Sequence, residues 1–223
     1  MNSSRSLNIK YIASQVFYFA AFAAMMGYAS VYLLYKGFSN STIGIILSLC
    51  SILAVFLQPA LATFADSHKN IEIRKIITTI VAIAIVLSVA LLILPANQTI
   101  IFILIVSIFT LETTIQPLVN TLAFIFEKYN ININFGAARG LGSVAYAVTS
   151  IALGYVVEWF NPDLLPLCYV IFNVLLFIVV YTFVLPKGAQ SIEAKVEEET
   201  EETLVEENTS LLGFDKKKKK FLL

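Results

Sequence analysis

The sequence predicts an all-α membrane protein with six transmembrane helices. Of the 223 residues, 58% are hydrophobic and 13% are charged, and the mean hydropathy is +0.83. A soluble domain is about a quarter charged. The hydrophobic residues also gather into six separate stretches, each long enough to cross a bilayer as a helix of roughly 20 residues. These two observations favour helices that span a membrane over the buried helices of a large soluble protein.

The six stretches are separated by short breaks that hold turn-forming or charged residues. Breaks of this kind, such as 36–41 and 66–75, are typical of loops between helices. The predicted spans cover residues 11–35, 42–65, 75–95, 99–126, 137–159 and 163–185.

The basic residues indicate how the chain is oriented in the membrane. When the start of the chain is placed in the cytoplasm, 14 of the 15 lysines and arginines fall on the cytoplasmic side, and Lys36 falls outside. Cytoplasmic loops carry an excess of basic residues. We therefore expect a multi-pass protein of the plasma membrane with both termini in the cytoplasm.

The composition changes after Pro186. Nine of the 15 acidic residues lie between Glu193 and Asp215. We expect residues 1–186 to form the six-helix domain and residues 187–223 to form an acidic, disordered cytoplasmic segment. The segment ends in five lysines and three apolar residues, which is how a loop enters a further spanning helix. The alternative is a basic tail that touches anionic lipid.

The fourth span carries a stripe of polar residues at membrane depth. Glu112, Gln116 and Asn120 are spaced i, i+4 and i+8, so they share one face of the helix. Polar groups are costly inside a membrane and are candidates for function; the alternative for Glu112 is a packing contact with another helix. Pro117 frees a backbone carbonyl, which is tolerated where the helix faces protein or a water-filled cavity.

A second stripe follows in the fifth span, where Arg139, Ser143 and Tyr146 share one face. A guanidinium group can grip paired oxygens, and an aromatic ring can stack on an apolar ring surface. The stripe therefore suits a polyhydroxylated ligand. The alternative is that Arg139 extends to the cytoplasmic surface as an anchor.

Small residues in the same span favour close helix packing. Gly136 and Gly140, together with Ala138 and Gly142, have the small-xxx-small spacing that lets a second helix approach.

The break between the second and third spans holds a possible charge network. Asp66, Arg74 and Lys75 could together close one side of the helix bundle. The alternative is a solvated loop that follows the excess of basic residues on the cytoplasmic side.

Other chemistry has no sequence support. We find no metal-ligand spacing, no phosphate loop and no nucleophile motif, so we expect no cofactor and no metal. The lysine run has no interleaved aromatic residues, which argues against nucleic-acid binding. The spans lack the paired acids that an intramembrane hydrolase would use. We therefore expect that the protein is not an enzyme. Cys50 and Cys168 lie inside apolar runs and are expected to be core residues.

The fifth span carries the motif with the most specific resemblance. Asn134–Tyr146 is similar to the fifth-helix signature of the lactose permease group, the oligosaccharide/proton symporters of the major facilitator superfamily. The likeness extends from Tyr11 to Pro186. The run 44–75 resembles the loop motif of that superfamily, with Ala62 where the motif has glycine.

The resemblance implies an architecture and a site. The fold would be the amino-terminal half of a transporter, six helices in a three-plus-three inverted repeat. Arg139 matches the arginine that binds the sugar, Ser143 matches a cysteine that lines the site, and Tyr146 matches a tryptophan that stacks on the sugar. Asn120 stands where the family has a glutamate paired with the arginine, and Glu112 lies about two turns away.

The resemblance also implies a function. We expect transport of a small polar, sugar-like solute by proton symport, in a membrane lipid environment. The proton-carrying residues of the family lie in a second six-helix half, so we expect a second half or self-association to be needed. The alternative function is a non-transporting membrane protein whose acidic cytoplasmic segment recruits a partner.

Overall fold

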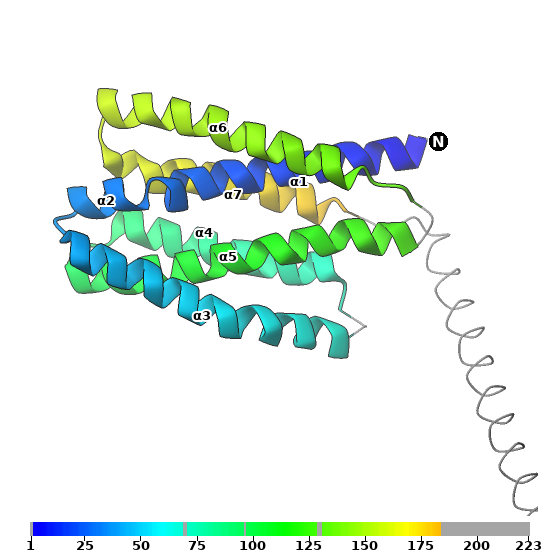
Figure 1. The fold of residues 1–223 in the computed structure, drawn as a ribbon, viewed down its shortest axis with the longest axis horizontal. Helices are drawn as coiled ribbons and strands as arrows, with labels where there is room; N and C mark the ends of the chain where they lie inside the picture. Colours follow the sequence, from blue (N-terminus) through cyan, green and yellow to red (C-terminus); the bar gives the residue numbers. More distant parts are fainter. Residues whose placement is uncertain (1, 69–70, 96, 129–130, 184–223) are drawn as a thin grey trace, which may run out of the picture. The chain divides into compact units, whose positions relative to one another are not determined.

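The computed structural model describes residues 2–68, 71–95, 97–128 and 131–183. Every regular element within these ranges is a helix (Figure 1). Six helices among the described residues are long and apolar enough to cross a membrane, so the prediction of an all-α protein with six spans is confirmed. The acidic segment predicted over 187–223 lies outside the described residues.

The elements follow one another with short connections. They are α1 (Asn2–Phe22), the π-helical turn η1 (Ala23–Gly27), α2 (Ala29–Tyr35), α3 (Asn40–Ser67), α4 (Ile73–Ile93), α5 (Gln98–Lys128), α6 (Phe135–Trp159), the 3₁₀ turn η2 (Pro162–Leu164) and α7 (Leu165–Tyr181). The first predicted span corresponds to α1, η1 and α2 together, and the sixth corresponds to η2 and α7.

The first span begins earlier than its hydropathy predicts. We expected a start near residue 11, and α1 begins at Asn2. Polar residues of this extension bond to the connection before α6 and to the end of α7. Asn8 Nδ2 donates to the Asn132 carbonyl at 2.8 Å, and Lys10 Nζ donates to the Thr182 carbonyl at 2.7 Å. These bonds stabilise a helical turn whose polar sequence would not by itself predict a membrane helix.

Consecutive spans run in opposite directions, so the connections alternate between two ends of the bundle (Figure 1). The start of α4, with Arg74 and Lys75, lies at one end, which we call the Arg74 end. The connection between α2 and α3 lies at the other, which we call the Lys36 end. The described basic residues lie mostly toward the Arg74 end, the pattern on which the predicted orientation depends.

The helices pack in an order that differs from their order in the chain. Helix α1 packs against α6 on one side and α7 on the other, α7 packs against α4, and α4 packs against α5, which in turn packs against α3 (Figure 1). Apolar side chains from several helices fill the core between them. Its fully buried members include Leu33, Ile46, Ile105, Phe109 and Tyr169.

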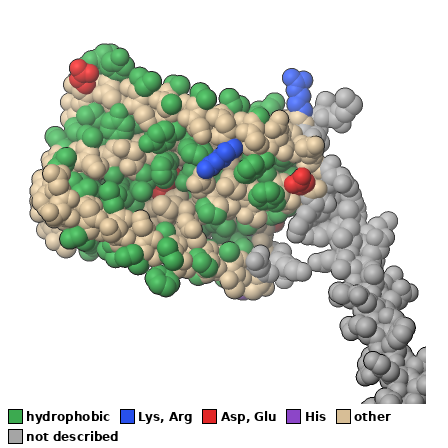
Figure 2. Space-filling model, viewed as in Figure 1, with side chains coloured by type: hydrophobic (Ala, Val, Ile, Leu, Met, Phe, Trp, Pro, Cys, Tyr) green, Lys and Arg blue, Asp and Glu red, His purple; other side chains and the backbone are tan. Residues whose placement is uncertain are grey.

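The two helices at the ends of this packing order, α3 and α6, leave large apolar faces uncovered. Phe56 of α3 is 71% exposed and Trp159 of α6 is 72% exposed. The face in Figure 2 is covered mainly by hydrophobic and neutral side chains, with few charges. Such a surface is unfavourable in water and favourable against lipid or another apolar helix.

The proline inside α5 has the effect predicted from the sequence. Pro117 has no N–H, so the carbonyl of Thr113 loses its bond within the helix. Gln58 Nε2 of α3 donates to this carbonyl at 3.0 Å. A side chain of the neighbouring helix therefore satisfies the carbonyl that Pro117 frees, and this bond joins α3 to α5.

The prediction from the small residues of α6 is half right. A Cβ added to Gly142 would lie 2.5 Å from the Phe19 ring of α1, and Ala138 is fully buried. A Cβ added to Gly136 or Gly140 would meet nothing within 4 Å. The close approach to α1 therefore uses Ala138 and Gly142, which are four residues apart, while the other two glycines face away.

Candidate functional site

Arg139 lies where α1, α5 and α6 meet, and its guanidinium group contacts both other helices. Its Cζ atom lies over the Phe19 ring of α1, 4.7 Å from the ring centroid. The Gln116 carbonyl of α5, in the amide orientation that pairs donors with acceptors, accepts from Arg139 Nη2 at 2.8 Å and also from Nη1. The structure thus brings together Arg139 and Gln116, which the sequence placed on two separate polar stripes. Arg139 as a whole residue is only half-buried, and its guanidinium fork has N–H donors beyond those bonded to Gln116.

Asn120 belongs to a neighbouring hydrogen-bond group. Gln15 of α1 is fully buried, and its Nε2 donates to Asn120 Oδ1 at 2.9 Å and to the Tyr11 hydroxyl at 2.9 Å. Asn120 is one helical turn from Gln116. Amide groups of α1 and α5 therefore continue the polar surface that begins at Arg139.

Glu112 points into the bundle and away from this surface. Its side chain is fully buried, and its Oε2 accepts from the Tyr169 hydroxyl of α7 at 2.7 Å. The Tyr18 hydroxyl of α1 donates to the backbone carbonyl of Glu112 at 3.3 Å. Glu112 therefore ties α5 to α1 and α7, which corresponds to the packing alternative that the sequence left open.

This position makes the two obvious replacements of Glu112 differ. Glu112→Gln keeps an acceptor for Tyr169, and we expect a small loss of stability. Glu112→Ala leaves a cavity and a buried hydroxyl without a partner, and we expect it to cost about 2–4 kcal/mol. Thermal unfolding of the detergent-solubilised protein, followed by the loss of its monodisperse peak in size-exclusion chromatography, measures the difference. Equal loss in both variants would contradict the Tyr169 bond.

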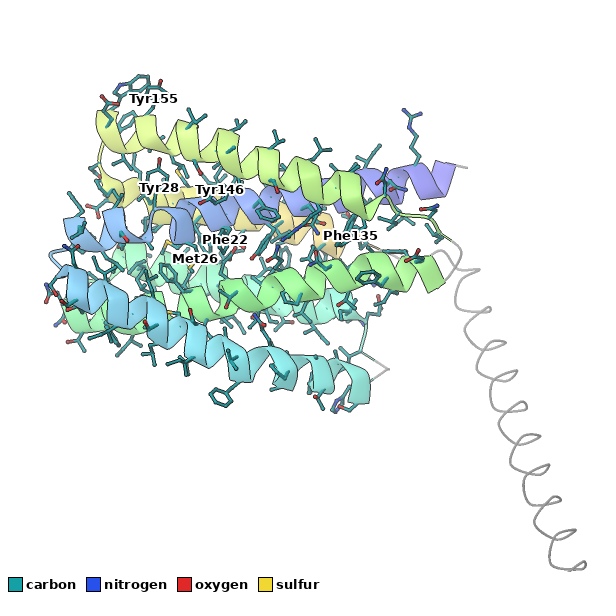
Figure 3. All side chains as sticks on the ribbon, in the orientation of Figure 1. Phe22, Met26, Tyr28, Phe135, Tyr146 and Tyr155 are labelled. Atoms are coloured by element: carbon teal, nitrogen blue, oxygen red, sulfur yellow. The ribbon has the colours of Figure 1, made fainter. Side chains whose placement is uncertain are left out.

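Ser143 and Tyr146 occupy different surroundings on α6. The Ser143 side chain is exposed, and its hydroxyl donates to the Arg139 carbonyl of its own helix at 3.3 Å. Tyr146 is half-buried and lies toward α1, with its ring centroid 6.2 Å from that of Phe22 (Figure 3). A Cβ on Gly27 would lie 3.0 Å from the Tyr146 hydroxyl. Ser143 therefore faces the open surface, and Tyr146 packs beside the π-helical turn.

The π-helical turn η1 widens the first span where it passes α6. Helices often contain such turns at functional sites. Tyr28, directly after the turn, donates from its hydroxyl to the Ser150 carbonyl of α6 at 2.6 Å. Figure 3 shows Phe22, Met26, Tyr28 and Tyr146 gathered at this crossing. These residues hold α1 and α6 together about two to three turns beyond Arg139.

Two of the three residues of the predicted charge network, Arg74 and Lys75, have side chains that the structure describes. Arg74 pairs with Glu72 and donates from Nη1 to the Tyr181 carbonyl at 3.1 Å. Lys75 Nζ lies 3.4 Å from Glu72 Oε1. The hydrogen bond from Arg74 holds the pKa of the Glu72 carboxyl below its usual value. The Asp66 side chain lies outside the described residues, so its part in the network stays a prediction.

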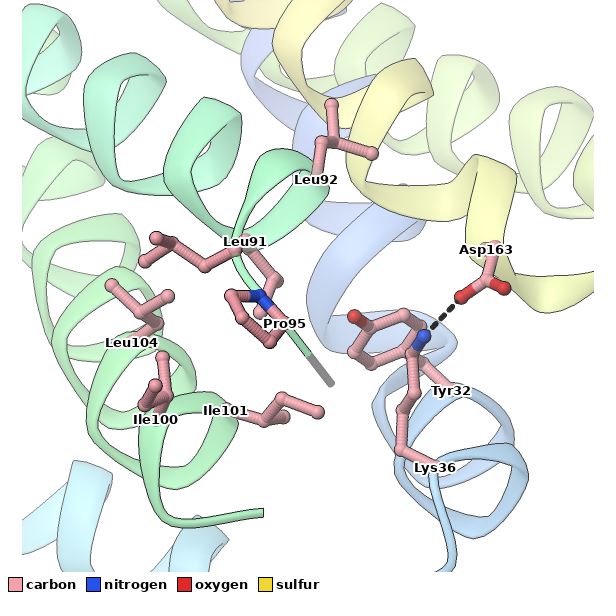
Figure 4. Close-up of a pocket in the computed structure, with 10 residues that line it drawn as sticks. Tyr32, Lys36, Leu91, Leu92, Pro95, Ile100, Ile101, Leu104 and Asp163 are labelled. Atoms are coloured by element: carbon pink, nitrogen blue, oxygen red, sulfur yellow. Dashed lines mark ion pairs between the residues drawn. The ribbon is translucent and has the colours of Figure 1, made fainter. Parts of the chain in front are cut away.

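A cavity of about 220 Å³ lies at the Lys36 end, away from Arg139 (Figure 4). Lys36 pairs with Asp163 there, and its ammonium group lies 5.6 Å from the centroids of the Tyr32 and Tyr35 rings. Leu104 is among the apolar residues that line the cavity. The ion pair joins the end of the first span to the start of the sixth.

The Lys36 ion pair should contribute little stability. The Asp163 side chain is 45% exposed, and pairs of this exposure contribute about 0–1 kcal/mol. We expect Asp163→Asn to lower the melting temperature of the purified protein by no more than a few degrees. A change as large as that expected for Glu112→Ala would contradict this account.

Several residues of the site were not predicted from the sequence. Gln15 and Phe19 of α1 and Tyr169 of α7 contact the predicted residues directly. The sequence offered a signal for Gln15, because placing its amide inside an apolar span costs as much free energy as placing the amide of Gln116 there. Phe19 and Tyr169 had none, because aromatic residues are common in spans.

In the part of the chain that the structure describes, six spans around a cluster of polar side chains define a multi-pass membrane protein. Among the described residues, no group of three His, Cys, Asp or Glu side chains could hold a metal ion. The model of the MFS_1 like family matches residues 8–222, and the chain belongs to this family. No curated protein and no solved structure matches the chain significantly. The family is of the major facilitator type, so the protein has a membrane transporter role. The narrower likeness to the lactose permease group stays a prediction.

Proposed function

We propose that the protein transports a small polar, sugar-like solute and binds it at Arg139. The observation that carries the proposal is the guanidinium of the half-buried Arg139, fixed between Gln116 and the Phe19 ring. A group held in this way is already oriented, so binding a solute costs little further ordering. Its remaining N–H donors suit the paired oxygens of a polyhydroxylated molecule.

Neighbouring side chains extend the proposed site along α5 and α6. Asn120 supplies an amide group, which the fully buried Gln15 holds in place from behind, and the exposed Ser143 hydroxyl lies one turn along α6 from Arg139. We assign no direct solute contact to Glu112, because the bundle covers it completely. Tyr146 contributes by shaping the α1–α6 crossing.

We further propose that the site is completed by a second six-helix unit or by a second copy of the chain. The uncovered apolar faces of α3 and α6 support this, because α6 itself carries Arg139 and α3 packs against α5, which carries Gln116 and Asn120. The six described spans would then form one wall of a cavity near the middle of the membrane. Arg74, Lys75 and Asp66 would belong to the cytoplasmic edge of the same unit, in a plasma membrane with both termini inside.

Uptake by vesicles that contain the protein tests the proposal. Radiolabelled disaccharides, monosaccharides, amino acids and organic acids would be offered separately, with the interior pH held above the exterior pH. We expect one sugar-like class to accumulate and the accumulation to collapse when a protonophore removes the pH gradient. Uptake that continues unchanged after this treatment would contradict proton symport. Failure of every solute to enter, with the chain alone and with cross-linked pairs of chains, would contradict the transport proposal.

A further inference from the structure

A second surface feature lies between α4 and α7, away from Arg139. It is a shallow apolar groove of about 440 Å³. Ile83, Val86 and Tyr181 at its edges are each 46–67% exposed. The lining residues are Thr78, Thr79, Ala82, Ile83, Val86, Leu87, Phe177 and Tyr181.

The groove has the depth of one membrane leaflet. Along α4 it extends from Thr78 to Leu87, a rise of about 14 Å at 1.5 Å per residue. The hydrocarbon core of a bilayer is about 30 Å thick, so one leaflet is about 15 Å deep. Since α4 extends from Ile73 to Ile93, the groove begins five residues from the start of the helix at the Arg74 end and ends about one turn past its middle.

The two threonines do not make the groove polar. The Thr78 hydroxyl donates to the Arg74 carbonyl at 2.9 Å, and the Thr79 hydroxyl donates to the Lys75 carbonyl at 2.8 Å. Both hydroxyls are therefore satisfied within α4. The wall that remains is lined by methyl groups and by the Phe177 and Tyr181 rings, which stack with centroids 6.0 Å apart.

Basic side chains lie at the mouth of the groove and exceed the acidic ones. Arg74 and Lys75 lie one turn before Thr78 and Thr79, on the same faces of α4. Lys10 and Arg74 donate to the adjacent carbonyls of Thr182 and Tyr181, which places both cations beside the groove. Among the described residues, Glu72 is the acidic residue that pairs with Arg74 and Lys75. Its charge is shared by two cations, and the Lys75 side chain stays 61% exposed.

We propose that the groove binds an anionic phospholipid of the leaflet at the Arg74 end. One acyl chain fills the groove between α4 and α7, and the phosphate lies against Lys75, with Arg74 and Lys10 behind it. The groove is about as long as one leaflet is deep, its wall is apolar, and positive charge is in excess at its mouth. All three features fit this ligand. A lipid without net charge would place an acyl chain in the groove but would gain no net attraction from the cations.

Native mass spectrometry of the full chain tests the proposal by counting bound lipids during titration. The probes are dioleoylphosphatidylglycerol and dioleoylphosphatidylcholine. We expect the wild type to prefer phosphatidylglycerol. Lys75→Gln should lower that affinity about fivefold, the effect of one basic residue near a lipid surface, and leave phosphatidylcholine unchanged. Arg5→Gln, which removes an exposed charge outside the groove lining, is the matched control.

A second pair of variants tests the groove itself. Ala82→Phe fills it and should weaken binding of both lipids, whereas Val148→Phe changes an exposed position of α6 and should weaken neither. Equal affinity of the wild type for the two lipids would overturn the proposal. So would Lys75→Gln behaving as Arg5→Gln does, or displacement of phosphatidylglycerol by glycerol phosphate, which has no acyl chain.

Discussion

Replacing Arg139 with glutamine should lower solute uptake by about 100-fold. A hydrogen bond to a charged group contributes about 1.5–3 kcal/mol, so losing two such bonds to a solute removes about 3 kcal/mol or more, and each 1.4 kcal/mol is a factor of ten. The variant also loses the cation over the Phe19 ring. Uptake measured at solute concentrations well below saturation reports this loss.

Two further variants separate the geometry of Arg139 from its charge. Arg139→Lys keeps the charge but lacks the planar fork and stacks poorly on Phe19, so we expect uptake well below the wild type. Arg5→Gln removes a charge from an exposed residue at the same end and should leave uptake unchanged. Full uptake by Arg139→Lys would mean that Arg139 acts only as a charged anchor, the alternative considered from the sequence.

Adding one methyl group at Gly142 should destabilise the protein by about 1–3 kcal/mol. The new Cβ of Gly142→Ala would lie 2.5 Å from the Phe19 ring, so either the ring or α6 must move, and overpacking of a tight contact costs about this much. Because Phe19 lies under Arg139, the variant should also reduce uptake. Thermal stability in detergent and uptake in vesicles measure the two effects.

The chain offers a matched control for this variant. Gly140→Ala makes the same change two residues earlier, where a Cβ meets nothing within 4 Å. We expect its stability to change by about 1 kcal/mol or less. If both variants lost the same stability, the cause would be the altered helix backbone, and the proposed contact between Gly142 and Phe19 would be wrong.

Hydropathy was sufficient to predict the spans, because the bilayer imposes the same length and polarity on every helix that crosses it. Hydropathy did not predict two features of the first span, its early start and its π-helical turn. The polar stretch before Tyr11 is helical because Asn8 bonds to the connection between α5 and α6 and Lys10 bonds to the end of α7. The π-helical turn at Ala23–Gly27 packs against α6 and α7, and its sequence carries no signal for it.

The site was predictable as stripes along single helices and not as contacts between them. Spacing placed Gln116 on one stripe and Arg139 on another, and the structure joins them. The same spacing could not show that Glu112 turns toward Tyr169, because a stripe can face a cavity or the core. Nor could it distinguish Gly142 from Gly140. Residues two apart lie on nearly opposite faces of a helix, and only the position of α1 decides which face is covered.

The most direct test of the account is whether solute protects the surface beside Arg139. Ser143→Cys would place a thiol at an exposed position of α6, one turn from Arg139, in a background with Cys168 replaced by alanine. Its alkylation rate by a maleimide would be measured with and without the solute that the vesicles accumulate. The account predicts that the solute slows alkylation, and that Arg139→Gln abolishes this protection. Unchanged alkylation in a protein that still transports the solute would place the binding site elsewhere and contradict the account.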